Sequence, residues 1–194
     1  MALPKETLDL IKHFEGYLRP LNDGSGRVRP YLCPANVPTI AFGSTFYENR
    51  VKVSMSDPPI TRERGERLLA FEIERICEPA VDKLVKRKLH PLSRGALVSF
   101  AFNCGTGALA RSGLLRAVNE GRWHDIEREF AKWRMGGGRV LPGLVRRRKA
   151  EADMFLKGVR LLSAGDTGVE LPRPTPNVET TSMWRKLIAW LLRE

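Results

Sequence analysis

The sequence has few cysteines, no long apolar run and a shortage of acidic residues. Its three cysteines, Cys33, Cys77 and Cys104, are an odd number without paired spacing, which predicts reduced thiols rather than a disulfide framework. No apolar run approaches the length of a transmembrane helix, and the first six residues do not resemble a signal peptide. These absences predict a protein that is made in a cytosol and has no export signal of its own.

Metal-binding and phosphate-binding motifs are missing as well. The three histidines, His13, His90 and His124, are scattered along the chain and lack the paired spacing of metal ligands. The glycines at 136–138 are not followed by the Lys and the Ser or Thr of a phosphate-binding loop. We therefore expect no metal ion and no cofactor.

The charge of the chain is strongly positive. The sequence has 33 basic and 22 acidic residues, a formal net charge of +11. This excess suits an anionic partner such as a cell-wall polymer, lipopolysaccharide or phospholipid. Nucleic acid would fit the charge too, but no recognition motif for it accompanies the charge, so we do not expect nucleic-acid binding.

The 194 residues suffice for one domain with a proper core and a tail. We place the domain at 1–160, a Pro-rich linker at 161–181 and a cationic amphipathic helix at 182–194. The apolar stripe of this helix recurs at helical spacing: Trp184, Leu187, Ile188, Leu191 and Leu192. Three roles remain open for it: packing back on the domain, lying in a membrane interface, and self-association.

Hydrophobic spacing and turn residues within 1–160 predict an α+β fold. We expect a first helix from about Pro4 to Glu15, and short strands at 28–33, 37–42 and 47–53. Further helices are expected from Thr61 to Pro79, which should end or kink that helix, from Ser93 to about 104, at 114–119, at 123–133, and from Pro142 to about Lys157. Cys77 and Cys104 should be small core residues. A small β lobe would then lie beside a larger helical lobe, with a cleft between them.

Glu15 is the most informative position. It should be the last residue of the first helix, because Gly16 is a natural left-handed stop. A carboxylate there faces the negative end of the helix dipole and adjoins apolar Phe14, and both effects favour the protonated form that a general acid needs. A solvated glutamate at the end of an ordinary helix is the alternative.

Four blocks of sequence carry a resemblance. They are Phe14-Glu15-Gly16, then Tyr31-x-Cys33-x5-Thr39-Ile40-x-Phe42-Gly43, and further along 100–108 and 137–148. Together they resemble the phage-type lysozymes, the endolysins of glycoside hydrolase family 24. The chain departs from that pattern in having extra residues at 21–29, and Cys33 where many members have Asp. A thiol is mostly neutral at pH 7, so Cys33 is a poorer base than a carboxylate.

The resemblance implies roles for six residues. Glu15 would protonate the glycosidic oxygen, while Cys33 and Thr39 would position the attacking water on the opposite face of the sugar, as in an inverting hydrolase. Phe102 would stack on saccharide and Asn103 would hydrogen-bond to it. One arginine of 146–148, taken as Arg147, would face the cleft and pair with Glu15. Plain packing for Phe102 and a structural role for Thr39 stay open.

The same resemblance implies an activity and a setting. The protein would be a monomeric muramidase that cuts the β-1,4 bond between N-acetylmuramic acid and N-acetylglucosamine in peptidoglycan during phage lysis. It would be made in the host cytoplasm and reach the wall through a holin pore. The alternatives are a lytic transglycosylase, and a cationic membrane- or wall-binding protein whose cleft is inactive.

Overall fold

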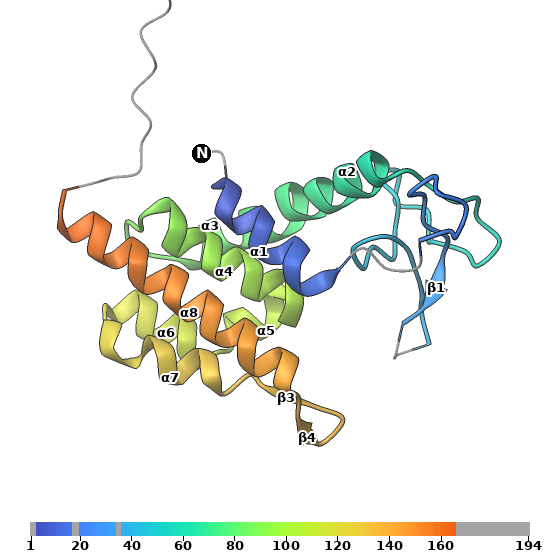
Figure 1. The fold of residues 1–194 in the computed structure, drawn as a ribbon. Coiled ribbons are helices and arrows are strands. Elements are labelled where there is room, and N and C mark those ends of the chain that lie inside the picture. The colour runs from blue at the N-terminus through green and yellow to red at the C-terminus, as the bar shows by residue number, and fades with distance from the viewer. Residues whose placement is uncertain (1–2, 17–19, 34–35, 166–194) are drawn as a thin grey trace, which may run out of the picture.

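The computed structural model describes residues 3–16, 20–33 and 36–165. Its elements follow the chain in the order α1 (Lys5–Glu15), β1 (Tyr31–Leu32), β2 (Pro38–Thr39), α2 (Arg62–Glu72), η1 (Ile73–Cys77), α3 (Glu78–Leu84), α4 (Pro91–Cys104), α5 (Thr106–Ala110), α6 (Gly113–Glu120), η2 (Trp123–Asp125), α7 (Ile126–Ala131), β3 (Met135–Gly136), β4 (Arg139–Val140) and α8 (Pro142–Ser163). The helices gather on one side, and the segment around β1 lies on the other (Figure 1).

Helix α4 is the centre of the helical lobe. Ten of its residues are buried, because its sequence is apolar or small on nearly every side, as expected for a helix surrounded by others. The long helix α8 packs against it, and the close approach depends on Gly158. A Cβ atom at Gly158 would lie 2.7 Å from the backbone nitrogen of Ser93, so no larger residue fits there. Ser93 Oγ also donates a 2.7 Å hydrogen bond to the carbonyl of Phe155.

Helix α1 is fixed against α4 by a similar device. Thr7 and Ile11, one turn apart on α1, are both fully buried. Gly95 of α4 lies directly under Thr7, and a side chain at Gly95 would collide with it. This packing holds the C-terminal end of α1, and with it Glu15, against the helical lobe.

The β segment is less regular than the sequence predicts. In place of each expected strand the structure has a two-residue strand or isolated β-bridges. Strand β1 pairs antiparallel with β2. Single bridges join Val28 to Ile60 and Phe46 to Lys52. Proline explains part of the difference, because Pro30 and Pro38 lack the N–H that a continuous ladder needs. The predictions of continuous strands at 28–33, 37–42 and 47–53 were wrong in extent.

Of the two effects expected of Pro79, an end or a kink of the helix after Thr61, the end does not occur. Thr61 caps α2 as expected, because its side chain accepts a hydrogen bond from the backbone N–H of Arg64. Helix α2 then continues through the π-helical turn η1 into α3. Glu78 N–H bonds to the carbonyl of Ile73, five residues back, so one extra residue is accommodated just before Pro79. The extra residue rotates the helix face, which leaves Ile76 54% exposed although the sequence placed it with the buried Cys77.

Several boundaries also differ from those expected. Helix α4 begins at Pro91, not at Ser93. His90 caps it, because His90 Nδ1 accepts a hydrogen bond from the backbone N–H of Leu92. The segment 123–133 is a 3-10 turn followed by α7, and the hairpin of β3 and β4 was missed. Helix α8 continues past Lys157 to Ser163, so the first residues of the expected linker are helical.

The α+β class and the lysozyme-like plan of a small β segment beside a helical lobe are confirmed. The predicted helix 182–194 lies outside the described residues. Among the helices that the structure does describe, none has the length and apolar character needed to cross a membrane.

Candidate active site

Glu15 lies where the helical lobe meets the β segment. It is the last residue of α1, and Gly16 stops the helix with φ 66°, a left-handed value that glycine adopts freely. The Gly16 N–H still bonds back to the carbonyl of Lys12 at 3.0 Å. The Glu15 side chain is 21% exposed, so it is fixed by the protein on one side and reachable on the other.

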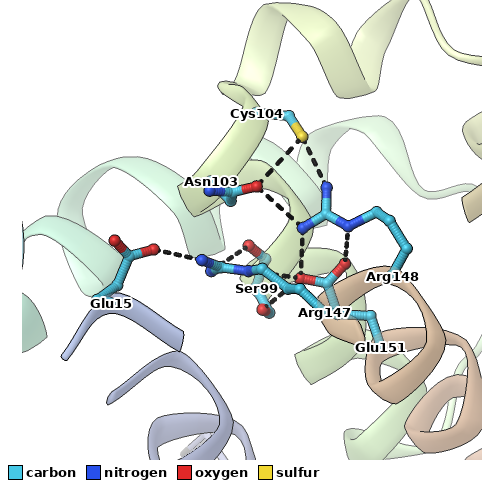
Figure 2. A network of polar contacts seen from close by, with 7 residues as sticks. All are labelled: Glu15, Ser99, Asn103, Cys104, Arg147, Arg148 and Glu151. Carbon is cyan, nitrogen blue, oxygen red and sulfur yellow. Dashed lines mark hydrogen bonds and ion pairs between the residues drawn. The ribbon is translucent and has the colours of Figure 1, made fainter. Parts of the chain in front are cut away.

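Arg147 of α8 holds Glu15 from the helical side. Its Nη1 forms an ion pair with Glu15 Oε1, as Figure 2 shows. The Arg147 side chain is only 3% exposed and is fixed by further contacts: Nε lies 3.1 Å from Glu151 Oε1, and Nη2 donates to the carbonyl of Ser99 at 3.4 Å. The guanidinium also lies 5.7 Å from the ring centroid of Phe14. The expected pair between Glu15 and one arginine of 146–148 is therefore present, and that arginine is Arg147.

A buried polar network supports Arg147. Glu151 is fully buried and accepts from Ser99 Oγ at 2.7 Å and from Arg148 Nη2 at 2.9 Å. Arg148 Nε lies 2.9 Å from the other oxygen of Glu151, an ion pair without hydrogen-bond geometry. Burial raises the pKa of Glu151, and the guanidinium groups of Arg148 and Arg147 oppose that shift. The network joins α4 to α8 directly behind Glu15 (Figure 2).

The β segment approaches the other oxygen of Glu15 through a tight turn. Ile40 and Ser44 exchange backbone hydrogen bonds of 2.9 and 3.1 Å around the three residues 41–43. Gly43 adopts φ 101° in this turn, and a Cβ atom there would lie 3.6 Å from Glu15 Oε2. The backbone of the turn therefore faces the carboxyl group with no side chain between them.

Cys33 and Thr39 lie on the hairpin that leads into this turn. Tyr31 pairs with Thr39, and Cys33 N donates to Val37 O at 3.1 Å, so Cys33 and Thr39 are diagonal neighbours on one face of the hairpin. Thr39 is 2% exposed and its Oγ1 donates to the carbonyl of Val37 at 2.9 Å. Because the Thr39 hydroxyl proton is used in this hydrogen bond, only the lone pairs of Oγ1 remain available. Oγ1 can therefore accept a hydrogen bond from a water molecule. Cys33 is half-buried.

The two expected saccharide contacts lie at the end of α4. Phe102 is partly buried and packs against the hydrophobic core. Asn103 is exposed, but its Oδ1 accepts from Arg148 Nη2 at 3.0 Å, which fixes the side chain at the edge of the buried network. The predicted core position of Cys104 was wrong: it is half-buried and accepts from Arg148 Nη1 at 2.8 Å. Cys77 is a core residue, 3% exposed.

Sequence reasoning missed Glu72. This residue lines a cavity of about 650 Å³ between α2–η1 and the loop that follows the turn at 40–44. Burial raises the pKa of Glu72 to about 7, and the negative charge of Glu15 adds to the shift. The only signal in the sequence was a glutamate beside buried Ile73 on an amphipathic helix, which is a common pattern on solvated faces. Only the fold brings Glu72 close enough to sense Glu15.

This arrangement suits acid–base chemistry on a bond placed between the two parts of the molecule. The carboxyl group of Glu15 lies at the junction and is oriented by a buried arginine, and the Thr39 hydroxyl lies on the hairpin that leads into the turn facing Glu15. Within residues 3–16, 20–33 and 36–165, no group of His, Cys, Asp and Glu is arranged to hold a metal ion. The elements and the site together define a lysozyme-like protein.

Comparison with known proteins gives the family. The phage lysozyme family model matches residues 14–151, so the chain belongs to the phage lysozyme family. It is 35% identical to the endolysin of Bacillus phage B103 over 158 residues, which are 81% of this chain and 55% of that protein. The chain thus spans about half the length of that relative.

Two solved structures resemble the fold closely. The endolysin of Escherichia coli O157:H7 phage FAHEc1 superposes with a TM-score of 0.69 at 29% identity, covering 80% of this chain and 94% of that one. The muramidase domain of SpmX from Asticaccaulis excentricus superposes with a TM-score of 0.65 at 32% identity, covering 80% and 97%.

Proposed function

We propose that this protein is a muramidase that hydrolyses the β-1,4 bond between N-acetylmuramic acid and N-acetylglucosamine in bacterial peptidoglycan, in the course of phage-mediated host lysis. The observation that carries the proposal is the position of Glu15. Its carboxyl group lies at the junction of the two parts of the molecule and is held by a buried arginine, in a chain of the phage lysozyme family. The similarity to a muramidase domain adds support.

In the proposed mechanism Glu15 is the general acid. Oε1 is engaged by Arg147, so Oε2, which faces the turn at Gly43, is the oxygen free to carry the proton. Glu15 gives this proton to the glycosidic oxygen as the bond to the anomeric carbon breaks. Arg147 fixes the direction of the transfer by restraining the carboxyl group, and its own position is fixed by Glu151 and Ser99.

Thr39 and Cys33 position the attacking water in this mechanism. Thr39 Oγ1 accepts a hydrogen bond from the water, because its own proton is committed to the carbonyl of Val37. The Cys33 sulfur lies on the same face of the hairpin and gives a second contact. Attack from the face opposite Glu15 inverts the anomeric centre, the proton lost by the attacking water passes to solvent, and the partly exposed Glu15 regains a proton from solvent. Phe102 and Asn103 contribute to the saccharide surface at the end of α4, and the mechanism needs no cofactor or metal ion.

The test is mass spectrometry of fragments released from purified peptidoglycan by the wild type and by Glu15→Gln. Hydrated muramic acid at the reducing ends, lost in Glu15→Gln, is the expected result. Anhydro ends would instead assign a lytic transglycosylase, which also uses one acidic residue but no water. No fragments from either protein would contradict both enzymatic assignments and leave a cationic wall- or membrane-binding protein.

Cys33 is tested separately by replacement with Ser and with Asp. If the thiol positions the water, the Ser variant should be slower than the wild type, whereas Asp should retain or raise the rate because a carboxylate is the stronger acceptor and base. Activity that neither change affects would remove Cys33 from the catalytic set.

The partners and the setting follow the same proposal. Peptidoglycan is the substrate, the protein acts as a monomer, and it reaches the bacterial wall from the host cytoplasm through a holin pore. The cationic segment 182–194 binds anionic membrane or lipopolysaccharide. Removing residues 177–194 should then weaken binding to anionic phospholipid vesicles while activity on purified peptidoglycan persists; unchanged vesicle binding would refute the membrane contact.

A further inference from the structure

A second carboxyl group lies near Glu15, and the proposed bond cleavage does not use it. Glu72 is the last residue of α2 and is half-buried in the wall of the cavity between α2–η1 and the loop that follows Gly43. Thr45 of this loop lines the cavity too, and Gly43 itself faces Glu15 Oε2. The cavity therefore begins close to the oxygen of Glu15 that Arg147 does not hold.

The packing of α1 and α2 holds the two carboxyl groups near each other. Lys12 Nζ of α1 lies 3.1 Å from Glu66 Oε1 of α2, an ion pair that ties the C-terminal half of α1 to α2. Helix α1 and the turn η1, which begins directly after Glu72, both pack against α4. In this arrangement burial raises the pKa of Glu72 to about 7, and the negative charge of Glu15 contributes to the shift.

The other ionisable groups around Glu72 keep one charge state near neutral pH. Burial raises the pKa of Tyr47 and that of Cys77 to about 12, so both groups are neutral there. Arg50 and Arg75, which line the same cavity, stay positively charged throughout this range. Among the described groups that line the cavity, Glu72 is therefore the one that changes its charge between about pH 6 and 8.

Two interacting carboxyl groups influence each other's ionisation equally, because linkage between two protonation sites is reciprocal. Since the charge of Glu15 opposes the ionisation of Glu72, the charge of Glu72 opposes the ionisation of Glu15 by the same free energy. Arg147 acts the other way, because a guanidinium paired with Glu15 Oε1 favours the carboxylate. A general acid that is held by an arginine therefore benefits from a nearby negative charge that appears as the pH rises.

We propose that Glu72 is a positioning residue that acts through Glu15: as the pH rises above neutrality, its carboxylate offsets the charge of Arg147 and keeps the general acid protonated in a larger share of the molecules. The inference rests on the proposed function and deepens it, because Glu72 then determines how far activity extends on the alkaline side. Below about pH 6, Glu72 is mostly neutral and has no such effect. Glu72 contacts no substrate in this role and takes no part in bond cleavage.

The test is the pH dependence of kcat/KM for the full chain on purified peptidoglycan, with wild type and Glu72→Gln compared from about pH 5 to about pH 9. Glutamine has the shape of a neutral glutamic acid, so we expect equal values below about pH 6. At about pH 8 the variant should be slower by about fivefold, because Glu15 has lost the opposing charge. Glu72→Asp, which keeps an ionisable group, should recover most of this difference. Glu74→Gln removes an exposed charge two residues away and should follow the wild type at every pH.

Carbon NMR of the side-chain carboxyl groups measures the same coupling without any substrate. The titration midpoint of Glu72 should fall in Glu15→Gln, because the charge that opposes the ionisation of Glu72 is gone. A midpoint that stays at the wild-type value would overturn the inference.

The outcomes of the rate measurement separate this inference from the proposed function. A loss of kcat/KM in Glu72→Gln that is equal at all pH values would assign Glu72 to packing and overturn the inference. A profile identical to that of the wild type, or the same alkaline loss in Glu74→Gln, would overturn it as well. The muramidase assignment would survive each of these results as long as the wild type cleaves peptidoglycan. If the wild type released no fragments at any pH, the proposed function itself would fail, and this inference with it.

Discussion

The two sides of the proposed site are built in different ways. On the helical side, Glu15 is held by the side chain of Arg147, which is itself held by Glu151. Both of these side chains are buried where α8 packs against α4. Thr39 and Cys33 are held from the other side by backbone, through a two-residue ladder and the turn at 40–44. The difference suggests that disrupting the helical side costs mostly stability, whereas changes on the hairpin side cost mostly rate.

The largest expected effect comes from Glu151→Ala. Removing this carboxylate leaves buried Arg148 without its carboxylate partner and leaves Arg147 with Glu15 alone, so we expect a loss of about 3–5 kcal/mol in the free energy of unfolding. Urea unfolding followed by circular dichroism measures it. The control is Asp153→Ala on the same helix, whose exposed carboxylate pairs only with Lys149 at the surface. Equal stability of the two variants would contradict a structural role for the buried network.

Arg147→Lys should be the next most damaging change. A lysine ammonium cannot reproduce the planar fork that joins Glu15, Glu151 and the carbonyl of Ser99. We expect a loss of about 2 kcal/mol in stability and at least about tenfold in kcat, because Glu15 loses its restraint. Arg146→Lys, on the exposed neighbour, is the control. Wild-type kcat in Arg147→Lys would show that the pair does not orient the acid.

Glu72→Gln should change how stability depends on pH. The folded state raises the pKa of Glu72 to about 7, so between about pH 4.5 and 7 the folded protein binds more protons than the unfolded chain and stability falls as the pH rises. The contribution is complete below the unfolded pKa and is lost above the folded one. Removing the titration should flatten this fall by about 3 kcal/mol.

The measurement is a series of urea unfolding curves from pH 4 to 8, with Glu74→Gln in the same helical turn as the control for loss of one negative charge. Parallel curves for wild type and Glu72→Gln would mean that Glu72 is solvated like an ordinary glutamate, and would weaken the view of the cavity as an enclosed site.

Thr39→Val should have the smallest effect on stability. Valine matches the shape of threonine and only the bond to the carbonyl of Val37 is lost, so we expect about 1 kcal/mol in unfolding free energy. The rate should suffer far more, about a hundredfold, if Thr39 positions the attacking water. Steady-state kinetics beside the unfolding curve separates the two. A stability loss with an unchanged rate would return Thr39 to a structural role.

Local signals in the sequence were sufficient for much of the fold. Apolar spacing, Gly16, Pro142 and the Thr61 cap predicted both ends of α1 and the starts of α2 and α8 to within a few residues. Prediction failed where the backbone hydrogen bonds depart from the regular pattern of an α-helix or a β-ladder. The π-helical turn ahead of Pro79 rotated Ile76 into solvent, and proline interrupted the strands. The capping of α4 by His90 was not predicted, because a histidine cap has no common sequence signature.

The candidate site divides along the same line. By itself the sequence determined the family, the end of α1 at Glu15 and the hairpin carrying Cys33 and Thr39, because caps, turns and motifs are properties of neighbouring residues. Only the tertiary structure decided which arginine meets Glu15, that Glu151 supports it, and that Glu72 lies close to Glu15. Those relations depend on how α8 and η1 pack against α4, and on the burial that this packing creates, and neither is recorded in a local stretch of sequence.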